Sequence, residues 1–156
     1  MKKLLLGCIA LLLSACMQPL DMGNDQTGEP ILVTDLAGRW LVINYWAEWC
    51  APCRREIPQL NQLADSLAAS NVKVFGVNYD QLQGDFLKQA SEQMGIQFRV
   101  FQEDPAARFR LEATDRLPVT YLIHPDGETI ARLLGEQTAE QIIEALVRMG
   151  WSRKPE

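Results

Sequence analysis

Cys50 and Cys53 are the residues whose type and spacing point most directly to chemistry, because two thiols three positions apart can cycle between a dithiol and a disulfide. They lie in the run WCAPC, after an apolar stretch (residues 40–46) and before a segment with leucines at helical spacing. This strand-to-helix turn would place Cys50 at the start of a helix, where free backbone N–H groups favour a thiolate. A lowered thiol pKa lets a cysteine attack disulfides near neutral pH. We therefore expect a redox-active Cys50–Cys53 pair.

Four other uses of such a thiol pair are known in proteins. A zinc site needs about four ligands, and the only histidine of the chain, His124, falls in a different predicted turn. Haem attachment requires Cys-x-x-Cys-His, whereas Arg54 follows Cys53. A structural disulfide and copper(I) capture by two thiolates remain as non-catalytic alternatives. Redox exchange is preferred, with no metal and no cofactor expected.

The first fifteen residues have the layout of an export signal. Lys2 and Lys3 precede an apolar stretch of ten residues, 4–13, which is too short for a stable membrane span. The ending LSAC at residues 13–16 resembles the box of bacterial lipoproteins, in which cleavage precedes the cysteine and fatty acyl groups such as palmitate are attached to it. We expect a signal peptide over residues 1–15 and a lipidated Cys16. The alternative is an ordinary signal peptide with a chance cysteine.

Processing of this kind would leave Cys50 and Cys53 as the only free thiols, since Cys8 is removed and Cys16 is acylated. A framework of several disulfides is then excluded. Met17 stands where inner-membrane lipoproteins of enteric-type bacteria carry Asp, which favours the outer membrane.

Charge also narrows the choice of partners. The chain holds 15 basic and 20 acidic residues, and loss of Lys2 and Lys3 leaves a net charge of −7. This balance argues against nucleic acid or an anionic lipid surface as the main partner. The expected contact with a bilayer is made by the acyl groups on Cys16 instead.

The remaining chain divides into a polar segment and one domain. Residues 17–30 contain Gly and Pro without apolar periodicity, so residues 16–30 are predicted to be a flexible tether and residues 31–156 a single domain. Strands alternate with helices and then end in a hairpin, which predicts an α/β fold with a mixed sheet covered on both faces. The expected strands are 40–45, 72–78, 97–101, 119–124 and 129–134, and the expected helices are 52–69, 85–94, 105–111 and 138–149.

Several motifs resemble one known group of proteins. The run NYWAEWCAPC at residues 44–53 resembles the active-site strand and turn of thioredoxins, and RREIP at residues 54–58 resembles the membrane-anchored TlpA/ResA branch. LPVT at residues 117–120 is similar to the loop that carries the cis-proline of this fold, and residues 81–111 resemble the helix–strand insert of the branch. The resemblance implies a thioredoxin fold and extracytoplasmic thiol–disulfide exchange. Family roles include reduction of apocytochrome c and of other oxidised exported proteins.

The same resemblance implies roles for individual residues. Cys50 would be the nucleophile that forms a mixed disulfide with a substrate, and Cys53 would resolve it. Pro118 would lie against the thiols, with Leu117 offering backbone groups to an extended substrate. The site neighbours would be Trp49, Pro52, Leu117 and Pro118, with the exposed face of Trp49 forming an apolar docking surface.

Asn44 marks a departure from thioredoxins, which keep a buried Asp at this position. An amide cannot accept the proton that leaves Cys53. Glu56 is the candidate replacement, because it lies three residues after Cys53 on a neighbouring helix face and matches a glutamate of ResA-like proteins. The alternative is a solvated charge near the start of a helix, where acids are favoured.

We expect a monomeric protein-disulfide reductase, lipid-anchored on the periplasmic side of a bacterial membrane. Its partners would be protein disulfides and an upstream membrane thiol–disulfide electron donor. Ala51 and Pro52 lack the His found between the thiols of strong oxidants, which favours reduction, and an oxidant or isomerase is the alternative. Peroxidases of the peroxiredoxin kind need Thr-x-x-Cys, and Ala47 stands at that position. The sequence leaves the substrate, the donor and the redox potential open.

Overall fold

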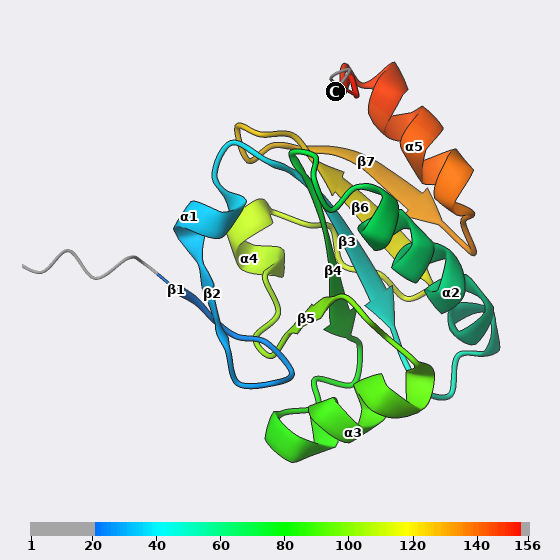
Figure 1. The fold of residues 1–156 in the computed structure, drawn as a ribbon. Coiled ribbons are helices and arrows are strands. Elements are labelled where there is room, and N and C mark those ends of the chain that lie inside the picture. Colours follow the sequence, from blue (N-terminus) through cyan, green and yellow to red (C-terminus); the bar gives the residue numbers. More distant parts are fainter. Residues whose placement is uncertain (1–20, 154–156) are drawn as a thin grey trace, which may run out of the picture.

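The computed structural model describes residues 21–153 and is built around a five-stranded sheet in the order β5-β4-β3-β6-β7 (Figure 1). β3 (Trp40–Trp46) pairs in parallel with β4 (Val72–Asn78), which pairs in parallel with β5 (Arg99–Phe101). On its other side β3 pairs antiparallel with β6 (Val119–Ile123), and β6 pairs antiparallel with β7 (Thr129–Leu134). The predicted mixed sheet is confirmed.

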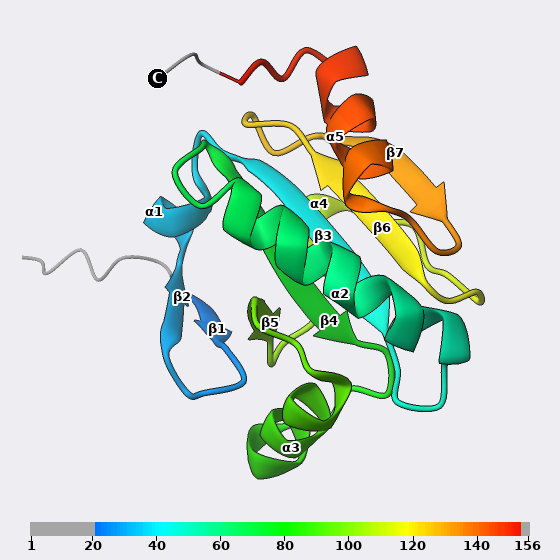
Figure 2. The same ribbon diagram turned by 45° about the vertical axis from the view of Figure 1, so that its right-hand side comes forward.

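β3 lies at the centre of the sheet, and all seven of its residues are buried. One face carries α2 (Ala51–Ser66), α3 (Gly84–Met94) and α5 (Ala139–Arg148), which pack with the side chains of Val42 and Trp46 in one apolar cluster. The other face carries α1 (Val33–Leu36) and α4 (Ala106–Phe109), packed against Ile43 and Tyr45. Figure 2 shows α2 lying across the sheet with α5 beside it. A strand covered on both faces is apolar along its length, which is why residues 40–46 do not alternate.

The helix ends follow local capping chemistry. Cys50 is the N-cap of α2, and Pro52 lies in the first turn, where a missing N–H is tolerated. Thr138 and Gln141 form the capping box of α5 that the sequence predicts.

The insert expected over residues 81–111 contains α3, β5 and α4. Between Asp21 and Arg153, no helix is long and apolar enough to cross a membrane.

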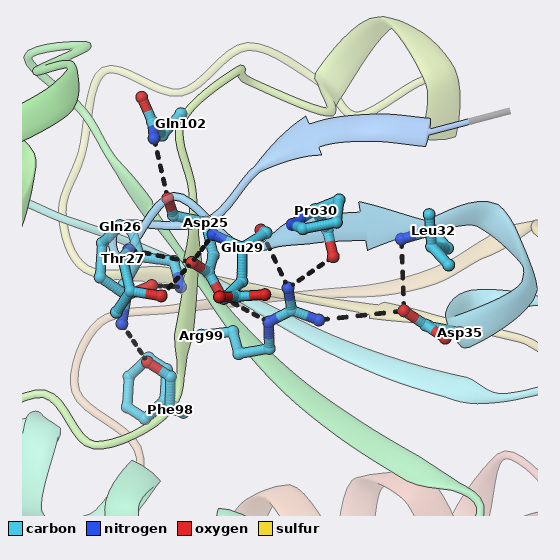
Figure 3. Close-up of polar contacts among 11 residues, drawn as sticks. Asp25, Gln26, Thr27, Glu29, Pro30, Leu32, Asp35, Phe98, Arg99 and Gln102 are labelled. Atoms are coloured by element: carbon cyan, nitrogen blue, oxygen red, sulfur yellow. Dashed lines mark hydrogen bonds and ion pairs between the residues drawn. The ribbon is translucent and has the colours of Figure 1, made fainter. Parts of the chain in front are cut away.

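The predicted tether is wrong for residues 21–30. β1 (Asp21–Asn24) pairs antiparallel with β2 (Pro30–Leu32), and the loop between them packs against β5 (Figure 3). Asp25 is buried, and its Oδ2 lies 2.7 Å from Nε of Arg99. Arg99 also donates from Nη2 to the carbonyl oxygens of Glu29 and Pro30, at 3.2 and 2.9 Å.

The side chain of Gln26 extends this attachment along the edge of β5. Its Oε1 accepts from the backbone N–H of Val100 at 2.7 Å, and its Nε2 donates to the carbonyl oxygen of Phe98 at 3.0 Å. The segment looks like a linker in sequence because its own residues are polar, whereas its hydrogen-bond partners in β5 lie 69 to 74 positions further along the chain. The predicted signal peptide and lipidated Cys16 lie outside the described residues.

Candidate active site

The thiol pair lies where β3 passes into α2. Cys50 and Cys53 form a disulfide with an S–S distance of 2.03 Å. The Sγ of Cys50 accepts the backbone N–H of Cys53 at 3.3 Å, so the first turn of α2 donates a hydrogen bond to this sulfur. Cys50 is 4% exposed and Cys53 is completely buried. In the disulfide form both cysteines are therefore buried, and the little exposed surface of the pair belongs to Cys50.

The predicted proline loop lies beside this turn. The peptide bond between Leu117 and Pro118 is cis. Val119 is the register partner of Tyr45 in β3, so Pro118 reaches the end of the strand from which the Cys50 turn begins. Pro118 is buried, and Leu117 is half-buried between the two apolar clusters. The topology thus brings together two motifs that are more than 60 residues apart in the chain.

Glu56 lies one turn after Cys53 on α2 and is completely buried. Its Oε2 accepts from Nδ2 of Asn44 at 2.9 Å, and its Oε1 accepts from the backbone N–H of Gln137 at 3.0 Å. Burial raises the pKa of Glu56 to about 7, and the two hydrogen bonds oppose this rise only in part. The alternative of a solvated surface charge is therefore wrong for this residue.

Asn44 occupies the face of β3 that packs against α2. It is fully buried and also donates from Nδ2 to Oγ1 of Thr120, its register partner in β6, at 2.9 Å. The central strand β3 thus carries an amide at this position, and the buried carboxyl group bonded to it comes from α2.

Trp49 forms an exposed aromatic surface next to the thiols. Its side chain is 65% exposed, and its indole Nε1 donates to both oxygens of Asp80, at 3.0 and 3.2 Å. The ring also meets Tyr79 edge to face, with centroids 6.2 Å apart. These contacts hold the indole at one position, as a docking surface requires.

Four further residues contribute to this region without being predicted from the sequence: Tyr79, Asp80, Thr120 and Gln137. Tyr79 and Asp80 directly follow β4, and the carboxyl ends of neighbouring parallel strands meet at one edge of a sheet. That rule could have predicted both residues. Gln137 acts through its backbone N–H, which no residue type reveals.

Comparison with known proteins agrees with this geometry. Residues 16–132 match the family model described as the AhpC/TSA family. The thiol-disulfide oxidoreductase ResA of Bacillus thuringiensis (strain Al Hakam) is 30% identical over 119 residues, which cover 76% of this chain and 68% of the relative.

Solved structures are similar in fold. A DsbF homologue from Corynebacterium diphtheriae superposes with a TM-score of 0.68 and 23% identity, covering 82% of this chain and 83% of that one. StoA from Bacillus subtilis gives a TM-score of 0.65 and 23% identity, with coverage of 81% and 96%. These likenesses establish the thioredoxin-like α/β fold.

Proposed function

This chain belongs to the AhpC/TSA family and is a thiol-disulfide oxidoreductase of the ResA type, and from that premise we propose that it reduces disulfide bonds of exported proteins through Cys50 and Cys53. The observation that carries the proposal is the asymmetry of the thiol pair. Cys50 is the N-cap at the positive end of α2 and keeps the small exposed surface of the pair, while Cys53 has none and lies one turn before a buried carboxyl group. Such an arrangement suits one nucleophilic and one resolving sulfur.

The proposed reaction takes place in two exchange steps. The Cys50 thiolate attacks one sulfur of the substrate disulfide, a mixed disulfide forms, and the other substrate sulfur leaves as a thiolate. The Cys53 thiolate then attacks the sulfur of Cys50, which releases the second substrate thiolate. Two electrons pass from the enzyme dithiol to the substrate, and the Cys50–Cys53 disulfide remains.

Glu56 is the proposed acceptor of the proton that leaves Cys53. The two residues lie one turn apart on α2, and the carboxyl group has no exposed surface. Because burial raises the pKa of Glu56 to about 7, this group can accept and return a proton near neutral pH. An acid with an ordinary pKa would hold the proton too weakly to serve.

The substrate surface in this proposal combines the exposed indole of Trp49 with the backbone of Leu117 beside Pro118. An extended peptide could pair with the backbone next to the cis-proline while an apolar side chain rests on the indole. Reduction of apocytochrome c cysteines is one reaction that this surface would allow.

A signal peptide over residues 1–15 and acylation of Cys16 would place the enzyme on the periplasmic side, preferably at the outer membrane. The described structure begins at Asp21, five positions after Cys16. Five extended residues reach at most about 18 Å, so the domain would work close to the lipid surface. Its dithiol would be restored by a membrane thiol–disulfide donor, with the enzyme acting as a monomer.

The proposed direction of electron flow is tested by a redox titration of the Cys50–Cys53 couple together with insulin reduction. CxxC proteins span about −270 to about −120 mV, and a reductase belongs near the lower end. A midpoint near −120 mV would contradict the reductase and favour an oxidant. Tight copper(I) binding without disulfide exchange would contradict both the reductase and the oxidant.

The proposed anchor is tested by fractionation of the full chain and of a Cys16→Ser variant. The wild-type protein is expected in the outer membrane, whereas the variant is expected in the soluble periplasmic fraction. Recovery of the wild-type protein in the inner membrane would overturn the proposed location.

A further inference from the structure

Asn44 lies at the centre of a buried polar cluster formed by Asn44, Glu56, Thr120 and the backbone N–H of Gln137. The side chains of Asn44, Glu56 and Thr120 have no exposed surface. Nδ2 of Asn44 donates to Oε2 of Glu56 and to Oγ1 of Thr120, both at 2.9 Å. One amide group therefore connects the acid on α2 to the strand that follows the cis-proline.

This orientation of the amide suits an ionised Glu56. Both carboxyl oxygens accept hydrogen bonds, one from Nδ2 of Asn44 and one from the N–H of Gln137. The opposite end of the same amide is unsatisfied: Oδ1 of Asn44 is buried, and none of residues 21–153 donates to it. Buried polar atoms without a partner are uncommon, because they lose their hydrogen bonds to water without compensation.

A protonated Glu56 would need the opposite orientation. Its O–H requires an acceptor, and the Nδ2 group of an amide cannot accept. Turning the Asn44 amide by half a turn brings Oδ1 to the place of Nδ2, where it can accept from both Glu56 and Thr120. The hydroxyl of Thr120 can serve in either state, because it both donates and accepts.

We propose that Asn44 is a positioning residue whose amide follows the protonation state of Glu56, with Nδ2 turned toward the carboxylate and Oδ1 turned toward the carboxylic acid. The proton that Glu56 gains thus finds an acceptor without movement of the backbone. The relevance to catalysis rests on the proposed function, in which that proton comes from Cys53.

An amide, unlike a second carboxyl group, keeps the site to one proton. Two carboxyl groups that share a hydrogen bond cannot easily ionise together, so their pKa values move apart. An Asp at position 44 would create such a pair with Glu56. Asn44 instead orients the acid while carrying no charge itself.

Few charged groups compete with Asn44 for this role. On α2 the neighbours of Glu56 include Cys53 and Arg55, and the loop before α5 contributes Glu136, which raises the pKa of Glu56. Nη2 of Arg55 forms an ion pair with Glu136 at 2.9 Å. β3 and β6 contribute the neutral side chains of Asn44 and Thr120. The amide is therefore the contact that must change when Glu56 gains a proton.

The test is an NMR titration of the full-length protein in detergent micelles, in its disulfide form. The carboxyl carbon of Glu56 and the side-chain amide of Asn44 are followed between pH 5 and pH 9. We expect both signals to share one midpoint, and the cross-peak between the Asn44 amide protons and Thr120 to be lost below it. A cross-peak that persists in the acid form would overturn the proposal. Asn61, whose amide bonds to Gly95 and Gln97 on the other side of α2, provides an internal control that should not titrate.

The isosteric variant Asn44→Asp gives an independent readout. Two coupled titrations are expected, one above and one below the single midpoint of the wild-type protein. One unshifted titration would show that position 44 does not share the proton of Glu56, which overturns the proposal. Asn61→Asp is the matched control and should leave the Glu56 midpoint unchanged.

These measurements need no thiol exchange, so the two proposals can fail separately. An amide that follows Glu56 in a protein that never reduces insulin would support the role of Asn44 and contradict the reductase. Disulfide exchange by a protein whose Asn44 amide keeps one orientation would support the reductase and contradict the role of Asn44.

Discussion

Asp25 and Glu56 are two buried carboxyl groups with opposite electrostatic behaviour. Burial alone would raise the pKa of Asp25, but hydrogen bonds from Thr27, Arg99 and the backbone N–H of Glu29 outweigh it, and the pKa is lowered (Figure 3). Glu56 has no exposed surface at all, both donors that reach it within residues 21–153 are neutral, and its pKa is raised to about 7.

This comparison teaches that the partners of a buried acid, together with the depth of its burial, decide whether it stabilises the fold or serves chemistry. The charge of Asp25 is matched by Arg99, so Asp25 fastens the β1–β2 hairpin to β5. No cation within residues 21–153 pairs with Glu56, which can change its charge near neutral pH. The roles of the two acids can therefore be distinguished by replacing each with the amide of the same length, in the variants Asp25→Asn and Glu56→Gln.

The largest expected effect is on the pH dependence of stability at Glu56. Its folded pKa of about 7 exceeds the ordinary value of 4.5, so the folded state binds more protons and loses stability as pH rises from 4.5 to 7. Above pH 7 the accumulated cost is about 3 kcal/mol. Glu56→Gln should remove this dependence and stabilise the protein at pH 8.5 by up to that amount. Denaturant unfolding at pH 5 and pH 8.5 measures it, and a variant whose stability still falls with pH would contradict the assignment.

Asp25→Asn should have the opposite sign. Loss of the charge removes the 2.7 Å ion pair of Arg99 and leaves only its 3.9 Å contact with Asp35, and because Arg99 is partly exposed we expect a destabilisation of about 2 kcal/mol at neutral pH. The lowered pKa of Asp25 means that its stabilising contribution is present above the unfolded pKa of about 3.9 and is lost as pH falls through the folded pKa. The difference between variant and wild type should therefore shrink in acid. Equal stability at neutral pH would show that the hairpin does not depend on this pair.

Glu56→Gln should also slow disulfide exchange, by about tenfold to a hundredfold, because general acid–base groups contribute on this scale. Stopped-flow measurement of the reaction between the reduced protein and a peptide disulfide checks this. Asp25→Asn is the matched control, since it neutralises a buried acid at the β5 edge of the sheet, away from β3, and should leave the rate unchanged. A rate that Glu56→Gln does not alter would remove Glu56 from the mechanism.

The smallest effect is expected from Glu136→Gln. This substitution removes a like charge near Glu56 and releases Arg55 from its ion pair. Both changes favour the ionised form, so the Glu56 midpoint should fall, by less than about half a unit because the pair is solvent-exposed. Carbon-13 NMR of the Glu56 carboxyl group would detect it, and a rise in the midpoint would show the sign to be wrong.

Several local features were predictable from sequence because their causes are local. β4 begins and ends at the predicted residues, Val72 and Asn78, since an apolar run is bounded by polar turn residues. The capping box at Thr138 needs only residues one turn apart. The prediction of a tether over residues 21–30 was wrong because polar side chains of this segment form hydrogen bonds with Phe98, Arg99 and Val100. No short window of sequence reveals that these residues lie close by.

The sequence by itself determined the thiol spacing, the turn that makes Cys50 an N-cap, and the position of Glu56 one helical turn beyond Cys53. It did not determine whether Glu56 meets water. Only the tertiary structure decided that, by closing β3, β6 and the loop before α5 over the carboxyl group. The physical reason is that a pKa depends on solvation and on neighbouring groups in space, and these neighbours come from positions 44, 120 and 137.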